Sequence, residues 1–358
     1  MAVIQAVFKH SDGATLAWHP ESLTEDENFS YHLRCLVTLE AKYWEDQENI
    51  VLDWGDPAQN IDAPALSLAC RNGSPRALLG RSWIHYHRPS HRMTIGVDLL
   101  GLFPALIVTL EEATYIASDA LALAQLLGNT AQPSGHALIQ LLAYGQLLGE
   151  QASLDNAWHL QAGSVCTFNH NGTYHVYNAQ PFSLSADSNS EDDAIDSLVA
   201  AMDKRLQGDP GALLPLSGGT ASRLLLAAAQ AAGHRPMTCC FAPPGSAEFE
   251  IANTLATVAG VEFHTVETIP RQFGAIQANI AQLGGGEVPM LRGCGLLSPE
   301  LIARTRGTTL ITTTGAKVFQ EPYYEHLSGG GELLSATWLK QPSLKAARRY
   351  AEDSFNKY

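Results

Sequence analysis

The chain has 358 residues, of which 46% are hydrophobic and 16% are charged, a globular composition that excludes a disordered protein. Its 22 basic and 36 acidic side chains give a net charge of −14, which argues against nucleic acid or an anionic membrane as a partner and favours small molecules or proteins. Because it has neither an apolar run of membrane-span length nor a signal-peptide start, we expect a cytoplasmic protein, and its length predicts two domains.

The first half of the chain is predicted to be layered β-structure with a few helices. The expected elements, in chain order, are strands at 94–98, 105–110 and 113–117, helices at 120–127 and 136–147, and a strand at 164–168. Asn171-Gly172, between Phe168 and Tyr174, indicates a hairpin turn. We therefore expect an α+β domain over residues 1–182.

A polar, weakly patterned stretch at 183–193 predicts the linker between the two domains. It ends in a helix-start signal, because Ser190 can cap a helix and the acidic residues Glu191 to Asp193 complement its dipole. A helix is expected from there to about Leu206, and the second domain is expected over 194–358.

Beyond the linker, strands and helices alternate. The expected elements are strands at 212–216, 237–241, 264–266 and 308–313 and helices at 224–232, 246–259 and 297–306. Alternation at this spacing predicts crossover units and an α/β domain with a parallel sheet. Ligands of such sheets bind at the carboxyl ends of the strands.

The first of these strands is followed by a loop of small residues, Ser217-Gly218-Gly219-Thr220-Ala221-Ser222. Glycines let backbone N–H groups face an anion, serine hydroxyls add donors, and the next helix offers its positive N-terminal end, so the loop has the composition of a phosphate cradle. The alternative is an ordinary strand-to-helix turn in which glycine allows close packing.

This loop resembles the SGGxDS pyrophosphate loop of the N-type ATP pyrophosphatases. Its surroundings resemble the asparagine synthetase group, with its β-lactam synthetase and lasso-peptide cyclase relatives. The matching segments lie in the family's order, at 98–104, 117–123, 141–149, 160–165 and 248–266.

The resemblance implies a glutaminase-like domain followed by an adenine nucleotide alpha hydrolase-like domain. It also implies that ATP with magnesium adenylates a carboxylate and that an amine then displaces AMP. By this resemblance Ser217, Gly218, Gly219 and Ser222 would hold pyrophosphate. Phe241 would lie near the adenine, and Gly315 would belong to a second cofactor loop.

Three departures from the family limit this assignment. Ala2 stands where the family's glutaminase has its nucleophilic cysteine, so glutaminase activity is not expected. Ala221 and Lys317 align with the two aspartates that hold magnesium, so no metal ligand is assigned and Mg²⁺ is not expected. The domain is also short, since the sequence ends at Tyr358 without a counterpart of the family's closing helices.

Two cations are the candidates to replace the metal. Lys317 could act as a fixed charge and Arg223 could pair with phosphate, so these two are the catalytic candidates. The alternative for Lys317 is a solvated or salt-bridged surface lysine.

Three functions follow from these observations. The first is an asparagine-synthetase-like protein with impaired or lost amide-ligase chemistry, which binds a nucleotide, a carboxylate metabolite or a protein partner. The second is an active ATP-dependent amide ligase without glutaminase activity, acting on a small-molecule carboxylate and an amine. The third is a scaffold subunit of an active relative, or a homodimer.

Two further patterns remain open. His85-Tyr86-His87 with His91 has the spacing of a metal site or, alternatively, of a polar strand face. The glycine runs at 284–287 and 329–332 predict mobile loops.

Overall fold

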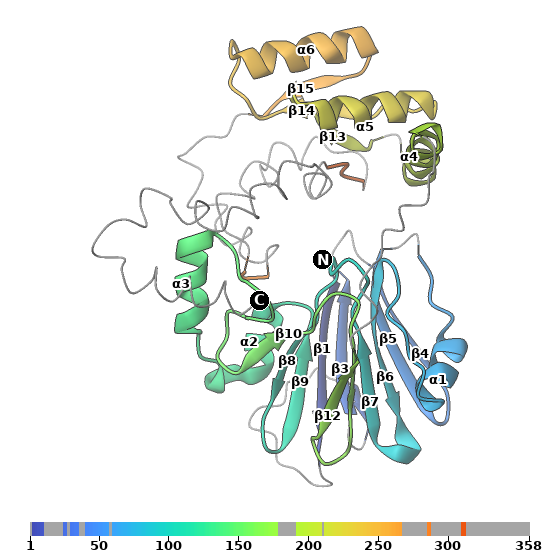
Figure 1. Cartoon of the computed structure of the whole chain (residues 1–358), viewed down its shortest axis with the longest axis vertical. Coiled ribbons are helices and arrows are strands. Elements are labelled where there is room, and N and C mark those ends of the chain that lie inside the picture. Colours follow the sequence, from blue (N-terminus) through green and yellow to red (C-terminus); the bar gives the residue numbers. More distant parts are fainter. Residues whose placement is uncertain are drawn as a thin grey trace, which may run out of the picture. The chain divides into compact units, whose positions relative to one another are not determined.

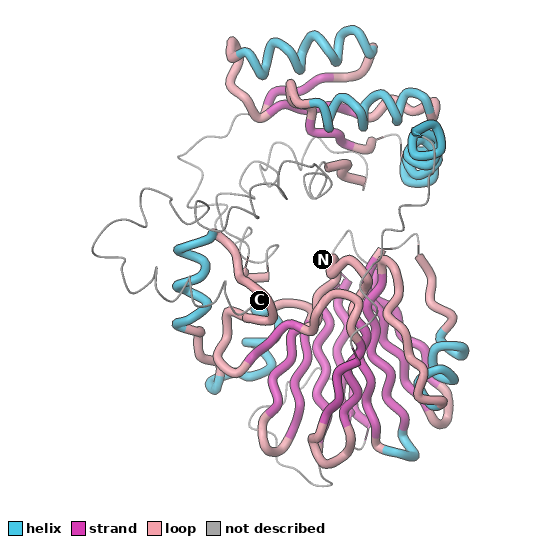
Figure 2. Tube along the Cα trace, viewed as in Figure 1, coloured by secondary structure: helices cyan, strands magenta, loops and turns pink. Residues whose placement is uncertain are grey.

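The computed structural model of the chain describes residues 2–10, 24–26, 29–35, 40–56, 59–177, 191–209, 211–266, 285–287 and 309–312. They form a mixed α/β protein with three sheets and two compact units (Figures 1 and 2). Unit 1 comprises the described residues up to Tyr177 together with 285–287, and unit 2 comprises those of 191–266 and 309–312. Among the helices that the structure describes, none is long and apolar enough to cross a membrane.

Unit 1 is built on two six-stranded antiparallel sheets. The first sheet has the order β10 (Ala157–His159), β8 (Leu106–Thr109), β9 (Ala113–Ala117), β1 (Ala2–Lys9), β3 (Phe29–Cys35) and β2 (Thr24–Asp26). The second has the order β12 (Tyr174–Tyr177), β11 (Val165–Phe168), β7 (Arg92–Gly96), β6 (Arg81–His87), β5 (Asn49–Gly55) and β4 (Glu40–Glu45).

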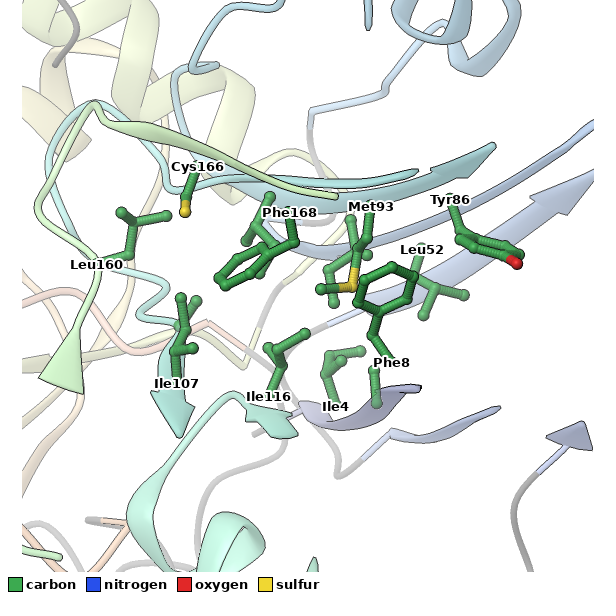
Figure 3. Close-up of a cluster of buried hydrophobic side chains, with 14 of the residues drawn as sticks. Ile4, Phe8, Leu52, Tyr86, Met93, Ile107, Ile116, Leu160, Cys166 and Phe168 are labelled. Carbon is green, nitrogen blue, oxygen red and sulfur yellow. The ribbon is translucent and has the colours of Figure 1, made fainter. Parts of the chain in front are cut away.

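The two sheets pack face to face around one hydrophobic core. It contains Phe8 of β1, Leu52 of β5, Met93 of β7 and Phe168 of β11, and all four side chains are fully buried (Figure 3). Because successive side chains of a strand point to opposite faces, Val7 lies outside this core although Phe8 lies within it.

Helices cover the outer faces of both sheets. Leu123 and Leu126 of α2 (Ala120–Leu127) belong to the hydrophobic cluster on the first sheet, and Leu66 of α1 (Ala63–Arg71) belongs to the one on the second. Unit 1 is therefore layered as helix, sheet, sheet and helix. It also contains α3 (Gly135–Tyr144) and two short 3₁₀ helices (Arg88–Ser90 and Gly128–Thr130).

Unit 2 contains a parallel sheet with helices packed on it. In chain order its elements are α4 (Glu191–Leu206), β13 (Leu213–Pro215), α5 (Thr220–Ala231), β14 (Met237–Cys240), α6 (Ala247–Ala259) and β15 (Phe263–Thr265). The strands have the order β13-β14-β15, and Leu310 forms a parallel bridge with Leu213 on the other side of β13. The predicted parallel pairing is confirmed for these strands.

Most predicted elements are present, with shifted ends. Strand β9 and helix α2 have the predicted bounds, and the hairpin at Asn171-Gly172 joins β11 to β12. The helix predicted at 136–147 ends at Tyr144, because Gly145 adopts a left-handed conformation (φ 68°) and its N–H bonds to the Leu141 carbonyl. The helix predicted at 224–232 already begins at Thr220. The helix predicted at 297–306 lies outside the described residues.

Candidate functional site

The Ser-Gly-Gly loop lies at the carboxyl edge of the parallel sheet of unit 2. The Leu216 N–H donates to the Cys239 carbonyl (2.7 Å), which ties the start of the loop to β14. Strands β14 and β15 lie on one side of β13, and Leu310 lies on the other. The strand order therefore reverses at β13, and open parallel sheets bind their ligands beyond the carboxyl ends of the strands at such a point.

Two serines organise the loop. The hydroxyl of Ser222 is buried, accepts the Ser217 N–H (3.2 Å) and lies 3.1 Å from the carbonyls of Ser217 and Gly219. Its Oγ is also 3.0 Å from the Oγ of Ser217, which accepts the Gly219 N–H (3.2 Å). Ser222 therefore shapes the loop from inside, whereas Ser217 lies at its partly exposed surface.

The loop leaves the first turn of α5 open. Gly219 is the N-cap residue (φ −75°, ψ 152°), and no side chain caps the helix. The first four N–H groups of a helix have no acceptor within it, and this end of a helix favours negative charge. Because Gly219 and Thr220 are exposed, an anion has direct access to this turn.

The guanidinium of Arg223 folds back onto this turn. Its Nη2 donates to the Gly218 carbonyl (2.9 Å) and its Nε to the Gly219 carbonyl (3.4 Å). These bonds hold a positive charge beside the open amides, and the side chain remains exposed. The structure thus brings Arg223 together with Ser217, Gly218 and Gly219 in one loop.

The other predicted site residues are spread differently. Phe241 follows β14, so it lies at the same edge of the sheet as the loop. It is half-buried and packs against a buried cluster formed by Leu213, Met237, Cys239 and Val266. Gly315 and Lys317 lie outside the described residues.

Sequence reasoning missed a neighbour of the loop, Ile251 of α6. A Cβ at Gly218 would lie 3.4 Å from the Ile251 side chain, so the glycine backbone packs directly on it. Ile251 is 45% exposed, and single exposed apolar side chains are common, so the sequence held no signal that it would contact the loop.

The chemistry of the loop fits an anion and not Mg²⁺. It offers hydroxyl groups, backbone amides and a guanidinium, whereas Mg²⁺ is bound through carboxylates and phosphates. Ala221 is the second residue of α5 and contributes only a methyl group. Across the described residues, no group of three or more His, Cys, Asp or Glu side chains is placed to hold a metal ion.

A cavity of unit 2 lies away from the loop. It has a volume of about 270 Å³ and is lined by residues that include Ala212 and Pro236, which directly precede β13 and β14. These are the amino ends of the parallel strands, so the cavity is at the opposite edge of the sheet from Ser217.

In unit 1, β1 begins at Ala2, which pairs with Cys35 of β3. The alanine methyl group carries no nucleophile, so this position cannot attack a glutamine amide.

The His85 and His87 rings lie on one face of β6, as their spacing predicted, and stack with 6.4 Å between centroids. Each has a polar partner within unit 1. His85 Nε2 lies 3.0 Å from Asn49 Oδ1, and His87 Nδ1 lies 2.7 Å from Ser90 Oγ.

Burial lowers the pKa of His85 to about 4. The nearby charges of His87, Arg92 and Arg71 contribute to this lowering, and the charge of Asp46 opposes them. His85 is therefore neutral at physiological pH.

Comparison with known proteins leaves the family open. No protein-family model matches the chain, and no curated protein matches it. Among solved structures, glutamine-dependent NAD⁺ synthetase from Acinetobacter baumannii, in complex with ADP, is 20% identical with a TM-score of 0.28 and matches 52% of this chain. The matched part is 44% of that synthetase, so the chain spans less than half of its length.

Two further solved structures are similar at the same level. Glutamine phosphoribosylpyrophosphate amidotransferase from B. subtilis, complexed with ADP and GMP, is 11% identical over 82% of this chain and 93% of its own, with a TM-score of 0.27. The allosteric regulatory enzyme of purine biosynthesis is 11% identical over 74% of this chain and 80% of its own, with a TM-score of 0.27. Likenesses this weak establish neither a fold nor a function.

Proposed function

We propose that the loop from Ser217 to Ser222 binds the phosphate groups of a nucleotide or of pyrophosphate without Mg²⁺. One observation carries this proposal: an uncapped helix start opens at the point where the strand order of a parallel sheet reverses. The guanidinium of Arg223 supplies positive charge there, and the described loop has no carboxylate that would repel an anion.

For the whole chain we infer an asparagine-synthetase-like cytoplasmic protein whose amide-ligase chemistry is impaired or lost. Support comes from the replaced positions Ala2, Ala221 and Lys317, each of which removes a group that the resembled chemistry uses. Without the metal carboxylates, the charge that develops during phosphoryl chemistry loses its strongest stabiliser.

A second candidate is an active ATP-dependent amide ligase in which side-chain cations replace the metal. The position of Arg223 favours it, because a guanidinium 2.9 Å from the Gly218 carbonyl is within reach of a phosphate bound at the same turn. The two candidates share the anion site and differ in catalysis.

Titration calorimetry of the whole chain with pyrophosphate, ATP and AMP, each with and without Mg²⁺, tests the anion site. We expect binding that does not require Mg²⁺. Replacing Ser222 with Ala leaves the Ser217 N–H without its acceptor and should weaken binding at least about tenfold, which corresponds to about 1.4 kcal/mol. Ser246→Ala is the matched control, because that serine caps the neighbouring helix α6 and is not in the loop; it should leave affinity unchanged.

The proposal is wrong if none of the three ligands binds at millimolar concentration, or if both serine variants weaken binding equally.

Isotope exchange between pyrophosphate and ATP, measured with a panel of carboxylates, separates the two candidates. Exchange that Arg223→Gln abolishes would establish the active ligase, whereas binding without exchange supports the impaired one.

A further inference from the structure

A three-residue segment of the second half of the chain is seated on unit 1. Residues 285–287 belong to unit 1, although the nearest described residues on either side, Val266 and Thr309, belong to unit 2. We call residues 285–287 the strap. The Gly285 carbonyl accepts the Leu121 N–H (3.2 Å), so the strap supplies an acceptor to the first turn of α2.

Unit 1 leaves no room for a side chain at the first position of the strap. Gly285 is buried with φ +61°, and a Cβ built on it would lie 2.6 Å from the Cβ of Asp119. That separation is too short for any other residue, and Asp119 cannot move freely because its Oδ1 accepts the Ala122 N–H (2.8 Å) as the cap of α2. Gly286, with φ +83°, is also close, with its Cβ position 3.2 Å from Leu121.

The next residue is held by its charge. Glu287 Oε1 accepts the Ser153 N–H (2.7 Å), and its Oε2 lies 2.8 Å from Nε2 of His159 on β10. Burial acts to raise the pKa of Glu287, but the hydrogen bonds from His159 and Ser153 and the charge of His159 outweigh it and hold this pKa below its usual range. The carboxylate form is therefore the one that unit 1 binds.

Together these contacts select a sequence: two glycines in left-handed conformations followed by a glutamate. We propose that Asp119, Leu121, Ser153 and His159 form a recognition site for a Gly-Gly-Glu peptide segment, and that the strap is its intramolecular ligand. A site of this kind binds the same segment in trans once the strap is released. The tetrapeptide Gly-Gly-Gly-Glu occurs at 284–287 and again at 329–332, so the chain carries this ligand chemistry more than once.

The test displaces the strap by a substitution within it and leaves the residues of the recognition site unchanged. In the whole chain, Gly285→Ala adds the clashing Cβ. Gly73→Ala is the matched control, because Gly73 also lies in unit 1 with a positive φ (+70°) and its Cβ would meet nothing within 4 Å. Hydrogen exchange of the Leu121 amide reports release of the strap, and it should become faster in Gly285→Ala but not in Gly73→Ala. Fluorescence anisotropy then measures binding of labelled Gly-Gly-Gly-Glu-amide and of Gly-Gly-Gly-Gln-amide.

We expect the Glu peptide to bind Gly285→Ala at least about tenfold more tightly than it binds the unchanged chain or Gly73→Ala. The Gln peptide should bind Gly285→Ala at least about tenfold more weakly than the Glu peptide, since it lacks the charge that His159 and Ser153 hold. Adding His159→Gln should remove most of that difference. If Gly285→Ala does not fold, Glu287→Gln serves as a second variant in which the strap is released, because it removes only the charge of the strap.

Three results would overturn the proposal. One is an unchanged Leu121 exchange rate in both strap variants. Another is equal affinity for the Glu and Gln peptides. The third is a released strap with no peptide binding at millimolar concentration.

Discussion

Replacing Arg81 with Met should destabilise unit 1 by about 3–5 kcal/mol, the usual cost of leaving one member of a buried ion pair without its partner. Arg81 is only 1% exposed, and its Nη2 forms an ion pair with the Asp53 carboxylate on the neighbouring strand. Its Nη1 donates to the carbonyls of Asp56 (3.0 Å) and Gln59 (3.1 Å), so one side chain also holds the segment that follows β5. The methionine would leave a buried carboxylate and two carbonyls without these donors.

Hydrogen exchange at the amides of β5 and β6, converted to opening free energies, measures this loss within unit 1. The control is Arg71→Met, because the Arg71–Glu48 pair (3.2 Å) is 39% and 53% exposed and should contribute less than about 1 kcal/mol. The double change Asp53→Leu with Arg81→Met should recover part of the loss, since it also removes the buried carboxylate that Arg81 had paired with. Equal losses in Arg81→Met and Arg71→Met would show that burial of the ion pair does not matter.

This pair also shows why the first part of unit 1 was hard to predict. Strands β5 and β6 are almost entirely buried, yet they contain Asn49, Asp53, Arg81 and His85, so neither an alternating nor a continuous apolar pattern marks them. Arg81 and His85 have partners on neighbouring strands and loops, and a local pattern cannot report such partners. Strands β8, β9 and β11 and helix α2 are apolar with clear turn signals between them, and the sequence was sufficient to place them. The short strand β10 was not predicted.

The position and composition of the loop in unit 2 could be predicted from the sequence, but the arrangement of its side chains could not. Its composition and its place between strand and helix follow from local signals, and the sheet order that puts it at a reversal point follows once Leu310 pairs with Leu213. The contact of the Ser222 hydroxyl with the Ser217 carbonyl and that of the Arg223 guanidinium with the Gly218 carbonyl depend on side-chain conformations. The spacing of residues in the sequence does not predict these conformations.

The position of the strap could not be predicted from the sequence either, because long-range contacts determine it. A glycine run predicts mobility, yet residues 285–287 make specific contacts with Asp119, Ser153 and His159, which come from distant parts of the chain. Sequence spacing carries no information on these contacts.

Acid should destabilise unit 1 through His85 by about 3 kcal/mol in total, since each unit of pKa difference contributes about 1.36 kcal/mol. In the unfolded chain the imidazole takes up a proton below its ordinary value of 6.5, whereas burial keeps the pKa of His85 at about 4 in the fold. Its stabilising contribution is therefore complete above pH 6.5 and is lost as the pH falls from 6.5 to about 4. Protonation would also place a charge beside His87, Arg92 and Arg71, which Asp46 offsets only in part.

His85→Gln removes this titration while retaining an amide that can hydrogen-bond to Asn49, so it should flatten the dependence of stability on pH between 6.5 and 4 even if it lowers stability at neutral pH. Opening free energies from hydrogen exchange in β6, corrected for the intrinsic effect of pH on exchange, give the slope for each chain. His170→Gln serves as the control, because His170 is exposed in the turn after β11 and its replacement should leave the slope unchanged. Since the carboxylates of unit 1 titrate in all three chains, only the difference between slopes is diagnostic. A slope in His85→Gln as steep as in the unchanged chain would mean that acid acts on unit 1 through other groups.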